Sequence, residues 1–188
     1  MKLEINAKHL NALLANAADS KDVRYYLRGF CVDAANLRAM STQGHALLVV
    51  PMMVEDAPDT PEQIIYQSIK PMGKTIVRVE IDTDTDRMIA YAGNGKQSHF
   101  ALVRIEDAKF PDIDKILIKD EDIHSPVAGE ICFNPALVAD ISKALYVGET
   151  ASKCAVLFEF QEGSEHPLRA KFYEQPDVQC TIMPCRWS

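Results

Sequence analysis

The feature that most constrains this fold is a change of apolar periodicity that occurs at both ends of the chain. Within residues 5–18, leucine and alanine recur at helical spacing from Leu10 to Ala18, and Asn6 is placed to cap the helix. Three segments with strand composition follow, at residues 23–32, 37–42 and 45–54. The pattern predicts a strand, a helix and an antiparallel meander, a β-α-β-β-β unit.

The same order returns in the last third of the chain. Residues 131–133 suit a short strand, and Asn134 and Pro135 supply a cap and a first-turn proline. An apolar helical face runs from Leu137 to Leu145, and Gly148 is a stop signal. Further strands are predicted at residues 154–160, 168–173 and 178–183. Two copies of one pattern indicate an internal repeat.

The middle of the chain carries an abridged copy. Strands are predicted at residues 64–66, 75–81, 88–91 and 98–105. Pro71 and Gly73 leave room for only about a turn of helix before the second strand. The acidic run at residues 82–86 resembles the start of a calcium loop. However, Arg87 stands where that loop needs glycine, so a hairpin tip is favoured.

Composition excludes several classes of function. With 47% hydrophobic and 25% charged residues the chain is an ordinary globular protein, and no apolar run is long enough for a membrane helix. The N-terminus reads directly into a strand, so we expect a cytoplasmic protein. The five cysteines suit reduced thiols better than disulfides. A zinc site from Cys180, Cys185 and His166 fits no common ligand spacing.

No catalytic constellation is recognisable. The chain has no G-x-S-x-G sequence, and no nucleophile stands in a familiar setting near His45, which is better explained as a turn residue. We therefore expect no enzymatic activity, no metal and no cofactor. A metal-dependent enzyme built on the acidic hairpin or the His and Cys residues is the alternative.

Charge is unevenly distributed along the chain. Residues 1–50 contain six basic and four acidic residues, a net charge of +2, which leaves −9 for the remainder of a chain whose total is −7. A basic strip on an acidic body suits a nucleic-acid partner. A solvated surface without function explains the same charges.

Four segments, in order, resemble the bacterial DNA-polymerase sliding clamp, the beta subunit of the replicase. They are V-R-Y-Y-L-R-G at 23–29, S-T-Q-G-H-A-L at 41–47, K-F-P-D-I-D-K-I-L at 109–117 and the C-terminal T-I-M-P-C-R-W-S. Clamps carry V-R-Y-Y-L-N-G, A-T-D-G-H-R-L, R-F-P-D-Y-x-x-V-L and a final M-P-M-R-L. The resemblance implies an α+β DNA-clamp fold of repeated β-α-β-β-β units with antiparallel sheets.

The chain has about half the length of a clamp subunit, so the resemblance implies missing parts. Residues 1–117 would form one clamp-like domain from two units, the second abridged, and residues 118–128 a linker. Residues 129–188 resemble the second half of the last clamp domain. The first half of that domain has no counterpart, and the compact size favours a phage or mobile-element version. The resemblance thus implies the cytoplasm of a bacterial or phage-infected cell.

In clamps, a pocket between two domains receives short peptides from partner proteins. Carried over by position, the pocket would comprise Leu27, Thr42, Gly44, His45, Leu47, Pro111, Lys115, Ile116, Ile182, Met183, Pro184 and Arg186. Gln43, Ala46, Cys185 and Trp187 depart from the family pattern, so the affinity for the usual peptide is open. Plain core packing is the alternative for Leu47 or Met183 taken alone.

The resemblance also implies contacts with duplex DNA that are independent of sequence. The expected residues are Lys8, Lys21, Arg24, Tyr25, Tyr26, Arg28 and Lys143. Taken singly, each lysine is equally explained as solvated surface, and either tyrosine as a buried strand residue.

The predicted function is that of a clamp-like processivity factor, which tethers a DNA polymerase, clamp loader or repair protein to DNA. A regulatory decoy that keeps the pocket but forms no ring is the alternative. An unpaired third unit would expose a sheet edge and an apolar helix face. We therefore expect a homo-oligomer joined through that unit, and a unit that folds back on its own chain is the alternative.

Overall fold

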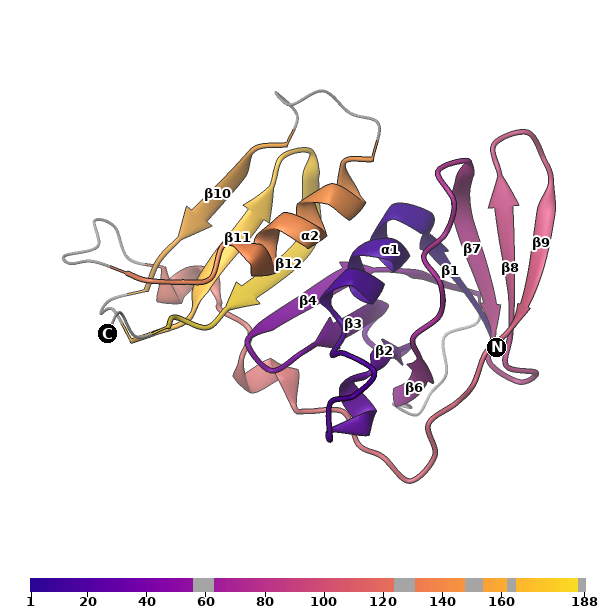
Figure 1. Ribbon diagram of the computed structural model, residues 1–188, viewed down its shortest axis with the longest axis horizontal. Coiled ribbons are helices and arrows are strands. Elements are labelled where there is room, and N and C mark those ends of the chain that lie inside the picture. The colour runs from indigo at the N-terminus through magenta and orange to yellow at the C-terminus, as the bar shows by residue number, and fades with distance from the viewer. Residues whose placement is uncertain (56–62, 124–130, 148–153, 162–164, 186–188) are drawn as a thin grey trace.

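The computed structural model describes residues 1–55, 63–123, 131–147, 154–161 and 165–185. It consists of two antiparallel sheets with helices packed against them (Figure 1). The strand order is β5-β1-β7-β8-β9 in the five-stranded sheet and β10-β11-β12-β4-β3-β2-β6 in the seven-stranded sheet. The predicted α+β architecture with antiparallel sheets is confirmed. In the described ranges, no helix has the length and apolar character needed to cross a membrane.

The elements are described by the three units into which the sequence was divided. The first unit contains β1 Lys2–Asn6, α1 Ala7–Asn16, β2 Gly29–Asp33, β3 Arg38–Thr42, β4 Ala46–Pro51 and the short β5 Met53–Glu55. The middle unit contains β6 Gln63–Gln67, β7 Ile76–Asp82, β8 Arg87–Ala92 and β9 Gln97–Ala101. The third contains α2 Ala136–Leu145, β10 Val156–Glu159, β11 Leu168–Phe172 and β12 Gln175–Ile182. Short 3₁₀ helices are η1 Tyr25–Leu27, η2 Ile113–Lys115 and η3 Asp120–Asp122.

Helix α1 begins where the sequence predicts. The Asn6 side chain accepts a hydrogen bond from the Lys8 amide at 2.8 Å, which satisfies a donor of the first turn. The apolar face of α1 is buried in the main core, where Leu10 and Leu13 are fully covered. Helix α2 lies beside α1 (Figure 1), and its Ile141 joins the same core.

The first two units exchange their first strands. Strand β1 pairs with β7 of the middle unit over five residue pairs, from Lys2 opposite Asp82 to Asn6 opposite Arg78. Strand β6 pairs in turn with β2 of the first unit over five pairs. Each of these two units therefore contributes strands to both sheets, and their apolar side chains lie in a core that the third unit also joins.

The third unit folds back on its own chain. Strand β12 pairs with β4, with Thr181 opposite Leu47 and Ile182 opposite Ala46, and the apolar face of α2 packs on α1. The expectation that this helix face would be exposed is thus wrong, because the first unit covers it. Among the described residues, the strand edge that this unit leaves open is the outer edge of β10.

Three predicted elements differ from the structure. The strand expected from residue 23 begins only at Gly29, because the Arg24 amide donates to the Asp22 side chain at 2.8 Å and the Leu27 amide to the Arg24 carbonyl at 2.9 Å, which closes a turn and η1. Residues 68–75 form no helix. Residues 131–133 are not part of a strand. Gly148 lies outside the described residues.

The loop that replaces the middle helix is held by one side chain of α1. Asn11 donates to the Met72 carbonyl at 3.0 Å and accepts from the Met72 amide at 2.6 Å. Met72 is thereby buried over the core. The two hydrogen bonds between the Asn11 side chain and the Met72 backbone thus fix the loop that stands in place of the helix that Pro71 and Gly73 prevent.

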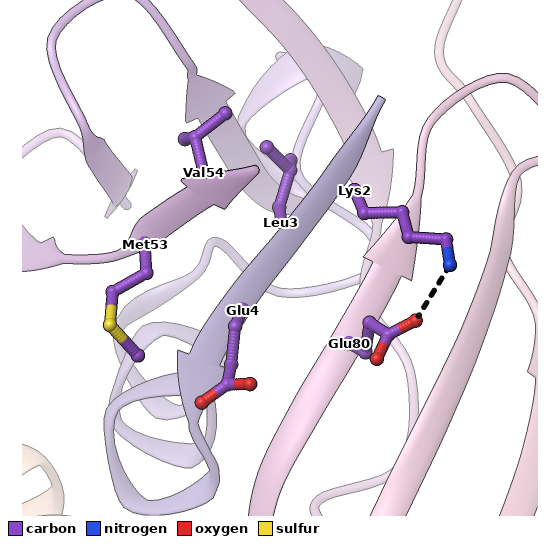
Figure 2. A pocket seen from close by; sticks show the side chains of 6 residues that line it. All are labelled: Lys2, Leu3, Glu4, Met53, Val54 and Glu80. Atoms are coloured by element: carbon purple, nitrogen blue, oxygen red, sulfur yellow. Dashed lines mark ion pairs between the residues drawn. The ribbon is translucent and has the colours of Figure 1, made fainter. Parts of the chain in front are cut away.

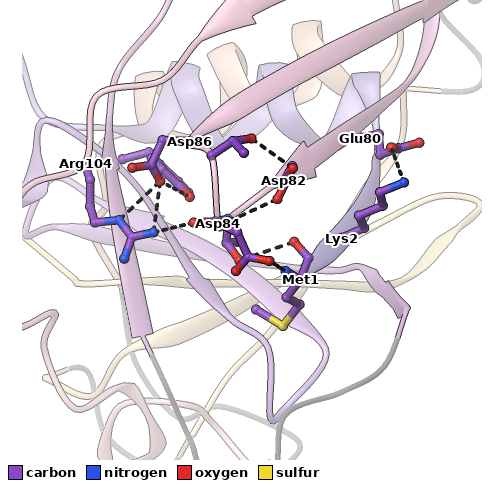
Figure 3. A network of polar contacts seen from close by, with 10 residues as sticks. Met1, Lys2, Glu80, Asp82, Asp84, Asp86 and Arg104 are labelled. Carbon is purple, nitrogen blue, oxygen red and sulfur yellow. Dashed lines mark hydrogen bonds and ion pairs between the residues drawn. The ribbon is translucent and has the colours of Figure 1, made fainter.

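The acidic run at residues 82–86 forms the predicted hairpin tip, between β7 and β8. Its charges are used internally (Figure 3): Asp84 pairs with the N-terminal ammonium group, and Asp86 accepts from Tyr66 at 2.9 Å and from Arg104 at 2.9 Å. Burial raises the pKa of Tyr66. The network ties the hairpin to β6 and to the segment after β9.

Candidate functional site

A cavity of about 380 Å³ opens where β4 of the first unit meets the end of β12. Eight of the twelve residues predicted for the peptide pocket line it: Leu27, Thr42, Gly44, His45, Leu47, Pro111, Ile116 and Met183. Arg24, Tyr26, Ala46, Ile113 and Thr181 complete the lining. The fold therefore brings together segments that are far apart in the sequence.

Strand alternation decides which residues of β12 reach the cavity. Thr181 and Met183 lie two residues apart and line it, whereas Ile182 between them is fully buried in the main core. The expectation that Ile182 is a wall residue is therefore wrong, because successive side chains of a strand point to opposite faces. The Met183 amide donates to the His45 carbonyl at 2.8 Å and so fixes Met183 at the rim.

One wall of the cavity comes from the segment that follows the middle unit. Phe110 and Ile113 are buried in a second core beneath the seven-stranded sheet, and Ile116 is 39% exposed beside the cavity. Arg38 holds this segment, since it bridges the buried Asp33 at 3.0 Å and Asp114 at 2.8 Å. The Arg38 guanidinium lowers the pKa of Asp114. Arg38 and Asp114, which are 76 residues apart in the sequence, thus position the wall. No local sequence pattern predicts that these two residues pair.

The floor is a tight turn between β3 and β4. Gly44 has φ +97°, a conformation that other residues adopt only with strain, and a Cβ there would lie 2.4 Å from Nη1 of Arg24. The Gly44 amide donates to the Thr42 hydroxyl at 3.0 Å, and the His45 amide to the Gln43 side chain at 2.6 Å. Glycine at this position therefore lets the arginine side chain pass beneath the turn.

Arg24 lies at the cavity, although the sequence suggested a role on DNA. It donates to both carboxylate oxygens of Asp22, at 3.0 and 2.7 Å, and to the Gln43 carbonyl at 2.9 Å. The hydrogen bond from Arg24 lowers the pKa of Asp22 to about 2. In the described part of the chain, Nη1 of Arg24 donates no hydrogen bond, so it is free to bind an acceptor in the cavity.

The remaining predicted pocket residues lie elsewhere. Lys115 points into solvent with 82% exposure and pairs with Asp112. Pro184 follows Met183 but does not line the cavity, and Arg186 falls outside the described residues. Among the additional lining residues, strand alternation along β12 could have identified Thr181, and the apolar start of the 3₁₀ turn could have identified Ile113. No local signal in the sequence places Arg24 at the cavity.

The predicted DNA contacts lie on both α-helices and in the segment between α1 and β2. Lys8 lies on α1 and Lys143 on α2, while Lys21 and Arg28 lie in the turn between α1 and β2. Arg28 donates to the Asp22 carbonyl at 2.6 Å, and Lys143 pairs with Asp140 at 2.9 Å. The ion pair of Lys143 reduces the positive charge that it offers to a phosphate backbone, and the bond of Arg28 occupies one of its donors.

The paired tyrosines of η1 have different surroundings. Tyr25 is 47% exposed, while Tyr26 lines the cavity. Their rings meet edge to face, with centroids 5.7 Å apart. Tyr25 is thus the ring of the pair that remains available to a partner outside the cavity.

Cysteine chemistry near the site involves one close pair. The sulfur atoms of Cys132 and Cys185 lie 3.1 Å apart as free thiols. Cys185 follows the cavity residue Met183 by two positions in the sequence. Cys31 and Cys180 are buried, and burial raises the pKa of both thiols. Across the described ranges, His, Cys, Asp and Glu side chains form no group of three or more that could hold a metal ion.

Comparisons with known proteins identify the fold. No protein-family model matches the chain, and no curated protein does. The DNA polymerase sliding clamp of Pseudomonas aeruginosa matches with a TM-score of 0.61 and 17% identity over 100% of this chain. The DNA polymerase III beta chain of Streptococcus pneumoniae matches with a TM-score of 0.61 and 16% identity, also over 100% of this chain.

The matches cover only part of the clamps. This chain spans 66% of the Pseudomonas aeruginosa clamp chain and 65% of the Streptococcus pneumoniae chain. The beta subunit of Streptococcus pyogenes gives the same picture, with a TM-score of 0.61 and 65% of its chain covered. The chain thus has the fold of the bacterial DNA-polymerase sliding clamp over about two thirds of a clamp chain, as the four sequence segments predicted.

Proposed function

We propose that this protein is a clamp-like processivity factor that binds short peptide segments of replication or repair proteins in the cavity between β4 and β12. The observation that carries the proposal is the convergence of eight predicted pocket residues on that cavity. A tether of this kind raises the effective concentration of its partner on DNA and catalyses no reaction. A DNA polymerase, a clamp loader or a repair protein would be the partner.

The cavity has the chemistry that a peptide anchor needs. Leu27, Leu47, Ile113 and Met183 provide apolar walls for a leucine or phenylalanine side chain. Thr42 and His45 supply polar groups for the peptide backbone. Nη1 of Arg24 would bind a peptide carbonyl or carboxylate, because its neighbouring nitrogens already hold Asp22 and Gln43.

Calorimetry tests the peptide site. A peptide with a clamp-binding motif should bind. Met183→Asp should weaken binding by about 2 kcal/mol, or about 30-fold, because the apolar contact between Met183 and the peptide anchor is replaced by a charge. Leu157→Asp is the matched control, since Leu157 is 61% exposed on β10 away from the cavity. Absence of binding at high micromolar peptide, or equal binding by the Met183 variant, would refute the assignment.

Binding to duplex DNA is the second part of the proposal. We expect it to be weak because Arg24 and Lys143 are paired with carboxylates. It should also be independent of sequence and steeply reduced by salt, because it would depend on contacts with phosphates. Lys8→Glu combined with Lys21→Glu should abolish it in fluorescence anisotropy while leaving peptide binding intact. These lysines are better targets than Arg24, whose loss would also alter the cavity.

A decoy that binds clamp-interaction peptides but not DNA is the competing function. The ion pairs of Arg24 with Asp22 and of Lys143 with Asp140 favour it. Peptide binding without any duplex binding at low salt would establish the decoy in place of the processivity factor.

A further inference from the structure

The end of the first unit is fastened to its beginning by strand pairing. Strand β5 pairs with β1 over three residue pairs, and Figure 2 shows one of them, Met53 opposite Glu4. Residues that pair across antiparallel strands project their side chains from the same face of the sheet, where these can interact. The segment after the last strand of this unit is thus held along the first strand.

The third unit repeats the start of the first. An asparagine precedes each helix and accepts a hydrogen bond from the amide two residues later, at 2.8 Å for Asn6 and at 3.0 Å for Asn134. Cys132 lies two residues before Asn134, as Glu4 lies two residues before Asn6. Cys132 therefore stands in the place of Glu4, the residue that pairs with Met53 in the first unit.

The partner of Cys132 in the third unit is Cys185. The Cys185 amide donates to the Cys132 carbonyl at 2.8 Å, and among the described residues this is the one backbone hydrogen bond between the two segments. The sulfur atoms are 3.1 Å apart, about 1 Å more than the roughly 2.05 Å of a disulfide bond. The end of the third unit is thus held by one backbone bond and by a pair of thiols in contact.

Solvent reaches this pair of thiols. Cys185 is exposed and Cys132 is half-buried, whereas Cys31 and Cys180 are buried. Cys185 is therefore the thiol of the pair that a dissolved oxidant meets first. The hydrogen bond between the two sulfur atoms raises the pKa of Cys132, so this thiol keeps its proton and reacts second.

The donor set favours oxidation over metal binding. A structural zinc ion takes four protein ligands. Across the described ranges, no further His, Cys, Asp or Glu side chain joins the two sulfur atoms to form a group of three. Two accessible thiols in contact are instead the arrangement in which a sulfenic acid condenses with its neighbour to a disulfide.

We propose that Cys132 and Cys185 form a reversible redox site, in which hydrogen peroxide converts the two thiols into a disulfide. The Cys185 thiolate attacks one peroxide oxygen, which breaks the O–O bond, leaves a sulfenic acid on Cys185 and releases the other oxygen as water. The Cys132 sulfur then attacks the sulfenic sulfur, the S–S bond forms, and the departing hydroxide takes the Cys132 proton. Two thiols thus lose two electrons, and one peroxide becomes two waters.

The disulfide would hold residues 183–185 at both ends. The Met183 amide already donates to the His45 carbonyl at 2.8 Å, at the rim of the cavity. The new bond fixes Cys185 to a residue 53 positions away, just before α2. A thiol reductant reopens it by exchange, and accessible disulfides are the labile ones. This inference rests on the two thiols and not on the proposed peptide binding.

Thiol counting tests the site. The full chain is treated with a small excess of hydrogen peroxide, denatured, alkylated with iodoacetamide and weighed by mass spectrometry. The reduced chain should take up five alkyl groups and the oxidised chain three, and dithiothreitol should restore the five. A digest of the oxidised chain should contain one linked peptide that joins Cys132 to Cys185. Five alkyl groups after peroxide treatment, or a linkage through Cys154, overturns the inference.

Serine variants provide the matched comparison. Cys185→Ser should give no linked peptide, because the first thiol to react is removed. Cys154→Ser removes another exposed cysteine and should give the same linked peptide as wild type. Loss of two alkylation sites in Cys185→Ser would show that a different pair of thiols is oxidised, and would overturn the assignment.

Thermal unfolding shows whether the bond forms in the folded chain without strain. Oxidised wild type should melt roughly 5–10 °C above reduced wild type, because the disulfide closes a long loop in the unfolded chain. The same shift is expected for Cys154→Ser and no shift for Cys185→Ser. An oxidised wild type that melts at or below the reduced form overturns the inference. These readouts involve no peptide and no DNA, so they are independent of the proposed function.

Discussion

The first unit has two neighbours, and it joins them in different ways. With the middle unit it exchanges strands over five residue pairs on each side, and the apolar side chains at that junction are covered. With the third unit it shares one strand pairing, β4 with β12, and one helix contact. A cavity lies at the end of this second junction. Strand exchange thus produces a closed core, whereas side-by-side pairing leaves loops around a site that a ligand can enter.

The largest expected difference is in the free energy of unfolding of two variants, with isoleucine replaced in corresponding segments of the first and third units. Ile5→Ala, in the exchanged strand β1, should lower the free energy of unfolding by about 3 kcal/mol because Ile5 is 4% exposed. Ile131→Ala should cost only about 1 kcal/mol, since Ile131 is partly buried. Urea unfolding at submicromolar chain measures both. Equal costs would contradict the view that the third unit is incompletely covered.

Arg38 tests how the cavity wall is held at the second junction. Arg38→Ala should cost about 3 kcal/mol, because it leaves the Asp33 carboxylate, 1% exposed, without its cation. Asp114→Asn removes only the exposed partner and should cost less than about 1 kcal/mol. Urea unfolding compares the two variants. A small effect of Arg38→Ala would show that the wall is positioned by apolar packing alone.

Gly44 tests the floor of the cavity. Gly44→Ala should cost roughly 1–3 kcal/mol, from a strained φ and from a Cβ that meets Arg24. Gly95→Ala carries a similar φ of +83° with nothing within 4 Å, so it isolates the backbone contribution. The difference between the two melting curves measures the contact with Arg24. Gly44→Ala should also weaken peptide binding, whereas Gly95→Ala should not.

The smallest effect concerns pH. The pKa of Asp22 is lowered to about 2, so its hydrogen bonds stabilise the fold fully above the pKa of the unfolded carboxyl and are lost as the pH falls through about 2. Carbon-detected NMR should give a midpoint of about 2 for Asp22. Arg24→Ala should raise it toward the ordinary aspartate value of about 3.9, because the side-chain hydrogen bond is lost while the amide of residue 24 still donates to Asp22. A midpoint that does not respond to Arg24→Ala would exclude the ion pair.

Local signals in the sequence predicted the repeated parts of the fold well. The cap at Asn6, the helical spacing of α1 and the hairpin at residues 82–86 follow from side-chain chemistry within a few residues. The sequence did not predict the turn at residues 23–28. Its alternating pattern is typical of a strand, and the hydrogen bond from the Arg24 amide to the Asp22 side chain, which closes the turn, leaves no mark in that pattern. Residues 131–133 have strand composition but lack the neighbouring strand that would define them.

The sequence predicted which residues line the candidate site, but not the contacts that hold them in place. Gly44, His45, Leu47 and Met183 converge because the clamp-like segments fall in the expected order. The pairing of Arg38 with Asp114, the placement of Arg24 beneath the turn and the pairing of β12 with β4 all depend on tertiary contacts. No periodicity in the sequence encodes these contacts, so they could not be derived from it.

The most direct measurement of the central claim is an amide NMR titration with a clamp-motif peptide. The amides of Gly44, His45, Ile116 and Met183 should shift first and saturate together, while those of residues 97–101 should not move. A replacement of the peptide's apolar anchor by aspartate should abolish the shifts. Shifts confined to other surfaces, or none at high micromolar peptide, would contradict the assignment of the β4 to β12 cavity as the binding site.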